Sequence, residues 1–343
     1  MDRILIIRLS SIGDIILTTP LIRAVRKKYP KAQLDFLIKT QFKSLVEYNP
    51  HISRVIAFDK TTDSLGALKQ DLRKNRYDWV IDIHKNFRSY FLSLGIRAGL
   101  VTRYRKQIFK RQLLVWFRLS TFRKNTPVLE RYFEAVATRG VKYDGEGTEV
   151  FLPESEKLTL KNLLQQGGYD NTSSLVAICP GASFTNKRWL ADRFAELANK
   201  LATKGKKIVL LGGRQDETLC AEIEATMITR PLNFTGKLSL LGSATLLSKV
   251  ELAITNDSGL MHLAQSQGTA VVAIYGPTVK ELGYFPMPVK STVVQADVAC
   301  RPCTHNGLNH CPKKHFNCMK LISTDQVFKA SEQYLGIGQP YHG

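Results

Sequence analysis

The chain has 343 residues, of which 44% are hydrophobic and 23% are charged, a composition typical of a globular protein. A single hydrophobic core rarely grows beyond roughly 250 to 300 residues, so we expect two domains. No apolar run reaches the roughly 20 residues of a membrane-spanning helix, and the N-terminal segment lacks the cleavage pattern of a secretory signal. The sequence therefore argues against an integral membrane protein and predicts a cytoplasmic one.

Positive charge is the most pronounced compositional feature. The 49 Lys and Arg exceed the 29 Asp and Glu, so the net charge is +20, which predicts nucleic acid, anionic lipid or a phosphorylated substrate as a partner. No acidic residue occurs between Ile83 and Leu129. The basic residues of this interval, here called the basic tract, are Lys85, Arg88, Arg97, Arg103, Arg105, Lys106, Lys110, Arg111, Arg118, Arg123 and Lys124.

Aromatic side chains are interleaved with the cations of the basic tract, among them Phe109, Trp116 and Phe122. Segments that lie on a membrane surface show this combination. A solvated helix whose apolar side faces the core shows it as well. The aromatic residues leave both interpretations open, whereas the clustered charge favours a functional surface.

Two series of short apolar runs alternate with helix-length segments, which predicts parallel sheets covered by helices. A polar stretch with Gly167 and Gly168 separates the series, so we expect a linker at 156–174 between domains at 1–155 and 175–322. The predicted strands are Ile4–Leu9, Leu34–Ile38, Val55–Phe58, Trp79–Ile83, Leu175–Cys179, Ile208–Leu211, Leu252–Thr255 and Val271–Tyr275.

The first predicted strand runs directly into Ser10-Ser11-Ile12-Gly13-Asp14, and we expect a helix from Ile15 to Lys28. Ligands of α/β folds bind at such strand-to-helix turns. Asp14 would then serve as a general base, with Gly13 allowing close approach of a substrate. Asp is also a preferred N-cap residue, and the spacing alone favours this capping role.

Two turns of the second series suit a phosphate group. Pro180-Gly181-Ala182-Ser183 follows a strand and precedes Lys187, and Ser258-Gly259 begins a helix whose N-H groups and dipole favour an anion. His262 lies one helical turn after Ser258 and could bind the same anion. The sequence lacks GxxxxGK[ST], so neither turn is a Walker A loop.

Four segments carry these features in a defined order and spacing: RLSSIGDIILTTPLIRAVRKKYP, PGASFTNKRW, LLGGRQDE and NDSGLMHLAQ. Together they resemble the ADP-heptose:lipopolysaccharide heptosyltransferases, glycosyltransferase family 9. The resemblance implies an α/β fold of the GT-B type, with two Rossmann-like doubly wound domains facing a central cleft. The first domain would bind the acceptor and the second the nucleotide sugar, and segment 323–343 would pack back on the first domain.

The resemblance also assigns roles to single residues. Asp14 matches the catalytic base of the family, and this role replaces the cap as our expectation. The other matches are Lys187, which would steady the donor diphosphate, Asp257, Ser258, Gly259 and His262, which would form the diphosphate-binding turn, and Glu217, which would hold the donor ribose.

The implied reaction is an inverting, metal-independent displacement, in which Asp14 deprotonates a hydroxyl of Kdo or heptose in the lipopolysaccharide inner core. Lys187 and the helix after Asp257 would stabilise the leaving ADP. ADP-heptose is a co-substrate, so no cofactor is expected. We also expect no nucleic acid among the partners. We expect a monomer at the inner face of the cytoplasmic membrane. The residues expected to face the acceptor and this membrane are Arg103, Arg105, Lys106, Lys110 and Arg111.

Four of the six cysteines form a group, here called the cysteine cluster, with the spacing Cys300-x2-Cys303-x7-Cys311-x6-Cys318. Four thiols suggest structural zinc, although the second pair is not the CxxC of a zinc ribbon. A disulfide is disfavoured in a reducing cytoplasm. The family resemblance offers a third interpretation, a Cys-rich segment without a catalytic role, and we expect no bound metal.

Three other functions compete with this interpretation. A related enzyme that uses another nucleotide sugar would share the phosphate-binding residues, because these recognise the leaving group. A nucleic-acid-binding protein would explain the positive net charge and the cysteine cluster, but the sequence contains no recognisable RNA- or DNA-binding motif. An NAD-dependent enzyme would need GxGxxG after the first strand, where the sequence has none.

Overall fold

The structure is a computed structural model that describes residues 1–122, 125–170 and 172–336. The chain forms two compact units, each built on its own parallel sheet, as the chain length predicted. The first unit contains Met1–Gln107 and Thr126–Phe151. The second contains Ile108–Asn125 and the residues from Leu152 onward.

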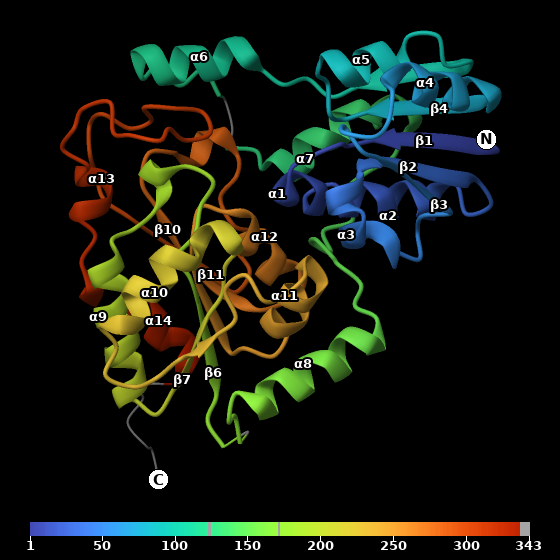
Figure 1. Cartoon of the computed structure of the whole chain (residues 1–343). Coiled ribbons are helices and arrows are strands. Elements are labelled where there is room, and N and C mark those ends of the chain that lie inside the picture. Colours follow the sequence, from blue (N-terminus) through green and yellow to red (C-terminus); the bar gives the residue numbers. More distant parts are fainter. Residues whose placement is uncertain (123–124, 171, 337–343) are drawn as a thin grey trace. The chain divides into compact units, whose positions relative to one another are not determined.

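The sheet of the first unit has the strand order β3-β2-β1-β4-β5, and every strand pair described in it is parallel (Figure 1). The inner strands are buried on both faces, which explains why they are nearly continuous apolar runs. The half-exposed edge strand β5 has a weaker pattern and was not predicted. The strands are β1 (Arg3–Ile7), β2 (Gln33–Lys39), β3 (Arg54–Phe58), β4 (Tyr77–Asp82) and β5 (Ala98–Arg103).

The sheet of the second unit has the order β11-β10-β9-β6-β7-β8 and is also parallel in its described pairs. Counted from its own first strand, this order is that of a dinucleotide-binding doubly wound fold. The strands are β6 (Leu175–Cys179), β7 (Lys207–Leu210), β8 (Leu232–Asn233), β9 (Leu252–Asn256), β10 (Ala270–Tyr275) and β11 (Ser291–Gln295). The two expected Rossmann-like doubly wound sheets are thereby confirmed.

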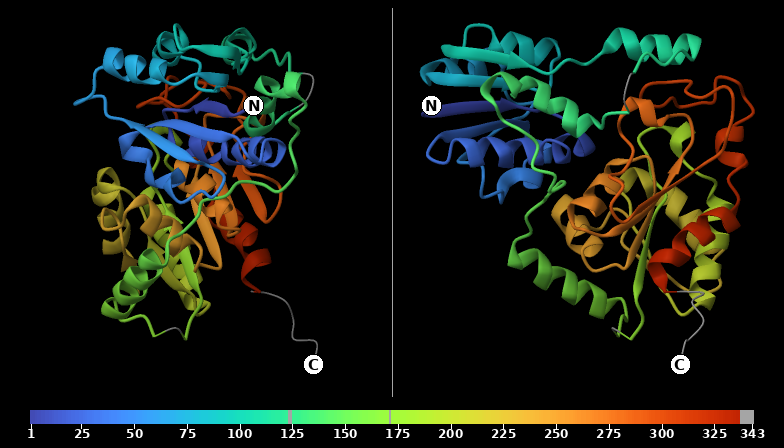
Figure 2. Two further views of the ribbon diagram at one scale, coloured as in Figure 1. Left: turned by 90° about the vertical axis from the view of Figure 1, so that its right-hand side faces the viewer. Right: turned by 180° about the vertical axis from the view of Figure 1, so that it is seen from behind.

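Helices cover both faces of the second sheet (Figures 1 and 2). On one face, α9, α10 and α14 enclose a core that includes Trp189 and Phe194. The Trp189 indole N-H donates to the carbonyl of Ile322 at 3.1 Å, so its one polar atom is satisfied inside the core. The helices of this unit are α6 (Ile108–Phe117), α8 (Glu154–Gln166), α9 (Ala191–Thr203), α10 (Glu217–Ala225), α11 (Leu240–Leu247), α12 (Gly259–Ser266), α13 (Asn317–Lys320) and α14 (Thr324–Leu335).

The core of the first unit contains apolar side chains from β1, β2 and β4, together with Leu72 and Leu92 from two covering helices. The helices of this unit are α1 (Ile12–Ile16), α2 (Thr19–Lys28), α3 (Ser44–Glu47), α4 (Leu65–Lys74), α5 (Phe87–Ser93) and α7 (Val128–Tyr132).

The single helix predicted from Ile15 to Lys28 is wrong, because α1 and α2 are separate helices. Pro20 has no N-H and cannot donate to the carbonyl of Ile16 as a continuing helix requires. That carbonyl accepts instead from the hydroxyl of Thr19 at 2.8 Å. The break limits α1 to five residues.

Two segments pack differently from the expectation. Residues 156–174 were expected to be a linker, but α8 covers most of this stretch and packs on α11 of the second unit. The segment 323–343 was expected on the first domain, but α14 packs on α9 and on β9, β10 and β11 of the second unit. Both helices have buried apolar side chains, Leu160 and Leu164 on α8 and Val327 and Leu335 on α14. Residues 171 and 337–343 lie outside the described part.

Within residues 1–122, 125–170 and 172–336, no helix combines the length and the apolar character that crossing a membrane requires.

Candidate functional site

Each sheet has a switch point, where the strand order reverses about its central strands. It lies between β1 and β4 in the first unit and between β6 and β9 in the second. In open α/β sheets, ligands bind at the carboxyl ends of the strands beside this point. The turn after β1 carries Asp14, and the turns after β6 and β9 carry Lys187 and Asp257. All three turns that the sequence analysis selected therefore lie at switch points.

Asp14 is the third residue of α1, and its carboxylate is held from three sides. The Arg8 guanidinium forms an ion pair with Oδ1 at 2.6 Å, and the Tyr132 hydroxyl donates to the same oxygen at 3.0 Å. The backbone N-H of Ser11 donates to Oδ2 at 3.4 Å. The exposed fraction of the side chain is 17%, so the carboxylate is oriented by its partners but still reaches solvent.

Burial would raise the pKa of Asp14, but Arg8, Tyr132 and Ser11 together hold that pKa below its usual value. The carboxylate is therefore ionised at physiological pH, which is the form that accepts a proton. Asp14 also reaches back to the N-cap residue Ser11, in the manner of a capping box. Ser11, and not Asp14, is therefore the N-cap residue of α1, and Asp14 is the third helical residue that contacts this cap.

In the second unit, hydrogen bonds from the last residue of β9 connect the turn after β6 with the turn after β9. The buried Asn256 at the end of β9 donates to the carbonyl of Pro180 at 2.7 Å and accepts from the N-H of Trp189 at 3.1 Å. Next to it, Asp257 pairs with the Lys187 ammonium at 2.6 Å. The hydroxyl of Thr278 donates to the same Asp257 oxygen at 2.7 Å. Lys187 is thereby fixed beside the turn after β9.

The turn after β9 continues into α12, with Ser258 as the N-cap residue and Gly259 as the first helical residue. The Ser258 hydroxyl is buried and has no hydrogen-bond partner among the described residues. His262 lies one turn further along α12 and is buried. A helix N-terminus with a fixed lysine beside it offers N-H donors and positive charge to an anion. The structure thus brings together Lys187, Asp257, Ser258 and Gly259 as expected, on one sheet edge.

Glu217 is the exposed first residue of α10, whereas its neighbour Asp216 is buried. Asp216 accepts from the N-H of Gly213 at 3.0 Å, and a Cβ placed on Gly181 would overlap its carboxylate. Asp216 therefore packs closely against the turn after β6. Of the two neighbouring acids, Glu217 is the one accessible to a ligand, and its ribose-binding role stays a prediction.

The basic tract is divided between the two units. Arg103, Arg105 and Lys106 belong to the first unit, whereas Lys110 and Arg111 lie on α6 in the second. Arg103 is not a freely exposed charge, because it donates to the Ser93 hydroxyl at 2.7 Å and stacks on the Tyr90 ring at 4.9 Å. Arg111 lies 5.8 Å from the centre of the Tyr284 ring and Lys110 lies 5.9 Å from that of Phe122. Arg123 and Lys124 lie outside the described residues.

One face of α6 is packed and the other is exposed. Leu114 and Val115 are buried, whereas Phe109, Trp116 and Phe117 are exposed. The aromatic side chains of α6 are therefore not part of the core, and their contact with a membrane surface stays a prediction.

The members of the cysteine cluster are free thiols, three half-buried and Cys318 buried. His315 Nε2 lies 3.9 Å from the sulfur of Cys300. Burial raises the pKa of Cys318 to about 11, with the neighbouring thiols of the cluster acting in the same direction. Among the described residues, no group of three or more His, Cys, Asp or Glu side chains is arranged to hold a metal ion. The role of the cluster stays a prediction.

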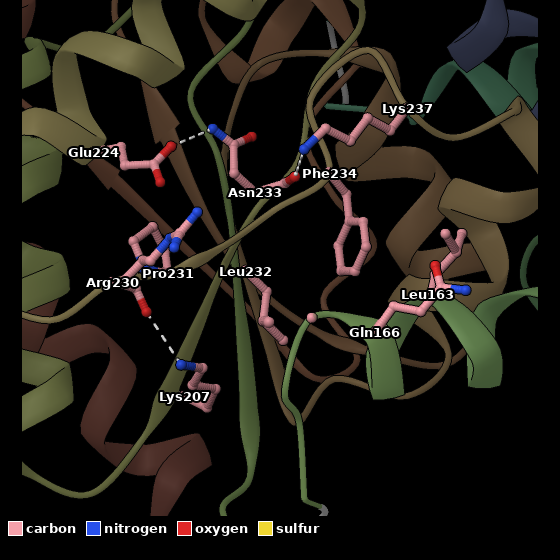
Figure 3. Close-up of a pocket in the computed structure, with 11 residues that line it drawn as sticks. Leu163, Gln166, Lys207, Glu224, Arg230, Pro231, Leu232, Asn233, Phe234 and Lys237 are labelled. Atoms are coloured by element: carbon pink, nitrogen blue, oxygen red, sulfur yellow. Dashed lines mark hydrogen bonds between the residues drawn. The ribbon is translucent and has the colours of Figure 1, made fainter.

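A further cavity of about 570 Å³ lies beside β8 in the second unit (Figure 3). Its polar groups are largely engaged with each other: Lys207 donates to the carbonyl of Arg230 at 3.1 Å, and Asn233 donates to Glu224 at 2.6 Å. Lys207 opens β7, so the cavity reaches the amino end of that strand. Ligands of such sheets bind beside the switch point, whereas this cavity lies at the edge strand β8, so we do not assign the site to it.

Several residues of the two sites were missed by the sequence analysis. Arg8 directly follows the apolar strand β1 and lies two residues before the Ser-Ser turn, and this position is a signal that the sequence offered. Tyr132 lies 118 residues from Asp14, and Thr278 lies 21 residues from Asp257. No local pattern identifies such partners, because the fold alone brings them into contact.

The comparisons with known proteins agree with this architecture. The sequence profile described as glycosyltransferase family 9 (heptosyltransferase) matches residues 65–314. Lipopolysaccharide heptosyltransferase 2 of Escherichia coli is 27% identical over 297 residues, which are 80% of this chain and 83% of that protein.

Two solved structures match almost the whole chain. The glycosyl transferase family 9 protein of Veillonella parvula has a TM-score of 0.83 at 28% identity, and 98% of each chain is covered. The ADP-heptose lps heptosyltransferase II of E. coli has a TM-score of 0.75 at 22% identity, again over 98% of each chain, and this second likeness concerns the fold. The chain therefore belongs to glycosyltransferase family 9, the heptosyltransferase family, and has the GT-B fold.

Proposed function

We propose that this chain transfers heptose from ADP-heptose to the lipopolysaccharide inner core, with inversion at the anomeric carbon and without a catalytic metal. The observation that carries the proposal is the pair of switch points, one with an ionised carboxylate and the other with a lysine beside a helix N-terminus. Relatives of the chain are named for heptosyl transfer to lipopolysaccharide.

Asp14 is the proposed general base. Its carboxylate is ionised and held by Arg8 and Tyr132, so it is ready to accept the proton of the acceptor hydroxyl as this oxygen attacks the anomeric carbon. Arg8 and Tyr132 contact Oδ1, whereas the backbone N-H and the hydroxyl of Ser11 donate to Oδ2. The acceptor sugar, Kdo or heptose, would then lie at the carboxyl edge of the first sheet.

The donor diphosphate is proposed to bind at the second switch point. Lys187 is positioned by Asp257 at 2.6 Å, and the N-terminus of α12 supplies the N-H groups of Gly259 and its neighbours. Negative charge grows on the leaving ADP during displacement, and fixed positive groups stabilise it most in the transition state. These groups occupy the electrostatic role that a metal ion has in other transferases. His262 would add a hydrogen bond from α12, and Glu217 would hold the ribose.

The basic tract is proposed to attract the anionic lipopolysaccharide precursor and the inner face of the cytoplasmic membrane. The exposed aromatic residues of α6 and its half-buried cations Lys110 and Arg111 support this placement, because basic, aromatic helices bind anionic interfaces. We propose that the enzyme works as a monomer.

The test is incubation with ADP-heptose and a panel of truncated lipopolysaccharides, followed by mass measurement of the acceptor. One heptose should be added, ADP should be released, and the configuration of the new linkage should be inverted in NMR spectra. A chelator should leave the rate unchanged. Transfer from another nucleotide sugar but not from ADP-heptose would contradict the donor, and retention of configuration would contradict the mechanism.

A further inference from the structure

His84 is a buried histidine beside the first switch point that none of the proposed roles uses. It follows β4, the strand next to β1, and the exposed fraction of the residue is 9%. Its Nε2 lies 2.7 Å from the Asn86 side-chain nitrogen. Its Nδ1 is buried and has no hydrogen-bond partner among the described residues.

The hydrogen bonds of Asn86 determine which ring nitrogen of His84 carries the proton. Asn86 Oδ1 accepts from the N-H of Ser89 at 2.9 Å, which fixes the orientation of the amide. The amide nitrogen therefore faces His84 and donates to Nε2. Since Nε2 is the acceptor, the neutral ring carries its proton on Nδ1. The nitrogen without a partner is thus a donor.

The loop that carries His84 is held rigidly. The buried Asp82 carboxylate accepts from the N-H of His84 at 3.1 Å, from the N-H of Lys85 at 2.8 Å and from the Ser89 hydroxyl at 3.0 Å. Lys85 has a φ of 45°, a strained value for a residue with a side chain. An unsatisfied buried donor adds a further cost. Strain and an unpaired donor at one rigid loop are typical of a preorganised binding site.

Several positive groups act on the His84 ring. Arg8, which pairs with Asp14, donates to the carbonyl of Ile83 at 2.6 Å and so lies directly beside His84. Lys39 ends β2, and its N-H donates to the carbonyl of Leu9 at 3.2 Å, on the same sheet edge. Burial, together with Arg8, Lys106 and Lys39, lowers the pKa of His84 to about 3, against the opposite effect of Asp14. The surroundings therefore favour a negatively charged partner for the ring N-H.

We propose that His84 Nδ1-H, together with the cationic side chains of Arg8, Lys39 and Lys106, binds an oxyanion of the acceptor saccharide. The oxyanion is a carboxylate or a phosphate, since both present the same acceptor atoms to this donor. Binding it beside Arg8 sets which neighbouring hydroxyl reaches Asp14, so His84 determines acceptor specificity. This inference rests on the proposed function, because it identifies the class of acceptor for the same site.

The kinetic test compares His84→Leu with His84→Asn, whose amide nitrogen takes the place of Nδ1. Three acceptors are used: a Kdo glycoside with a carboxylate, a phosphorylated heptoside and a neutral heptoside. His84→Leu should raise the KM of an anionic acceptor by roughly 10- to 100-fold, as expected for a buried hydrogen bond to a charged group. It should leave the KM of the neutral heptoside and the affinity for ADP unchanged. His84→Asn should restore most of the loss.

His51→Leu is the matched control. His51 lies in the same unit, 3.7 Å from Glu149 and in edge contact with Phe151, and has no part in the proposed site. Its replacement should leave all three acceptor KM values unchanged. Equal KM changes for anionic and neutral acceptors in His84→Leu, or the same change in His51→Leu, would overturn the proposal. A change with only one anionic acceptor would support it and identify the carboxylate or the phosphate as the source.

A binding measurement on the wild-type protein separates this inference from the proposed transfer reaction and does not depend on how the variants fold. Addition of the Kdo glycoside or the phosphorylated heptoside, without any donor sugar, should shift the ring nitrogen resonances of His84 in NMR spectra and leave those of His51 unmoved. Such a shift would support the oxyanion site even where no heptose is transferred. Saturating binding of both anionic probes without a His84 shift would overturn it.

Discussion

Replacement of Asp14 by Asn tests the proposed base most directly, because the amide keeps the size of the carboxylate but cannot accept a proton. In the structure the amide oxygen can still accept from Tyr132 or from the N-H of Ser11. The ion pair with Arg8 is lost. The side chains of Arg8 and Asp14 are 7% and 17% exposed, and removing one partner of a buried pair costs about 3 to 5 kcal/mol. We expect a loss near the lower end of this range, about 3 kcal/mol, because the introduced amide would keep one hydrogen bond.

A loss of this size leaves a protein with an ordinary unfolding free energy, roughly 5 to 15 kcal/mol, folded at 25 °C. Turnover should nevertheless fall by roughly 100- to 10,000-fold, the range for loss of a general base. The dissociation constant of ADP should not change, because Lys187 and Asp257 belong to the other unit. ADP release at saturating substrate, calorimetric titration with ADP and thermal unfolding measure these three quantities.

Asp144→Asn is the matched control for the loss of a paired carboxylate. Asp144 lies in the same unit and pairs with Arg23 at 2.9 Å and with Lys27 at 2.7 Å. Its replacement should lower the melting temperature and leave turnover at the wild-type level. Turnover of Asp14→Asn within about tenfold of the wild type, or an equal loss in Asp144→Asn, would refute the assignment of the base. Asp14 would then have only a structural role, through its contacts with Arg8, Tyr132 and Ser11.

Four further predictions follow from the sites. Lys187→Ala should raise the KM of the donor and lower kcat together, since a diphosphate contact exists in the ground state and strengthens in the transition state; unchanged donor kinetics would count against it. The low pKa of the buried His84 means that below pH 6.5 the unfolded chain binds a proton that the folded chain does not. The unfolding free energy should therefore fall as the pH drops from 6.5 toward 3, by up to about 1.4 kcal/mol per pH unit, and His84→Asn should reduce this slope in denaturant titrations. Metal analysis of the purified protein should find no zinc at the cysteine cluster, whereas one zinc per chain, lost with stability on chelation, would establish the structural-zinc interpretation. Phe109→Ser with Trp116→Ser should weaken sedimentation with anionic liposomes and leave ADP binding intact; equal sedimentation would assign the membrane contact elsewhere.

Local patterns in the sequence were sufficient for the strands and for the turns that carry the sites. All eight predicted strands are present within a residue or two of their expected ends. Seven of them are inner strands, and strands buried on both faces need continuous apolar runs. The eighth, β3, is a half-exposed edge strand that still has an apolar run at Val55–Phe58. The turns with Asp14, Lys187 and Asp257 could be found for the same reason, since each directly follows such a run. The missed strands β5 and β11 are edge strands with half-exposed residues, and β8 has only two residues.

The tertiary structure alone decided which residues meet. The strand order places β4 beside β1, and so brings His84 next to Arg8 across 75 residues of intervening chain. The same holds for Tyr132 at Asp14 and for Thr278 at Asp257. The positions of α8 and α14 were decided in the same way, by the faces on which their apolar side chains are buried. The hydrophobic periodicity of a segment indicates which of its sides faces a core. Many different pairings of segments are compatible with the same periodicity. The packing of the whole unit determines which of these pairings forms.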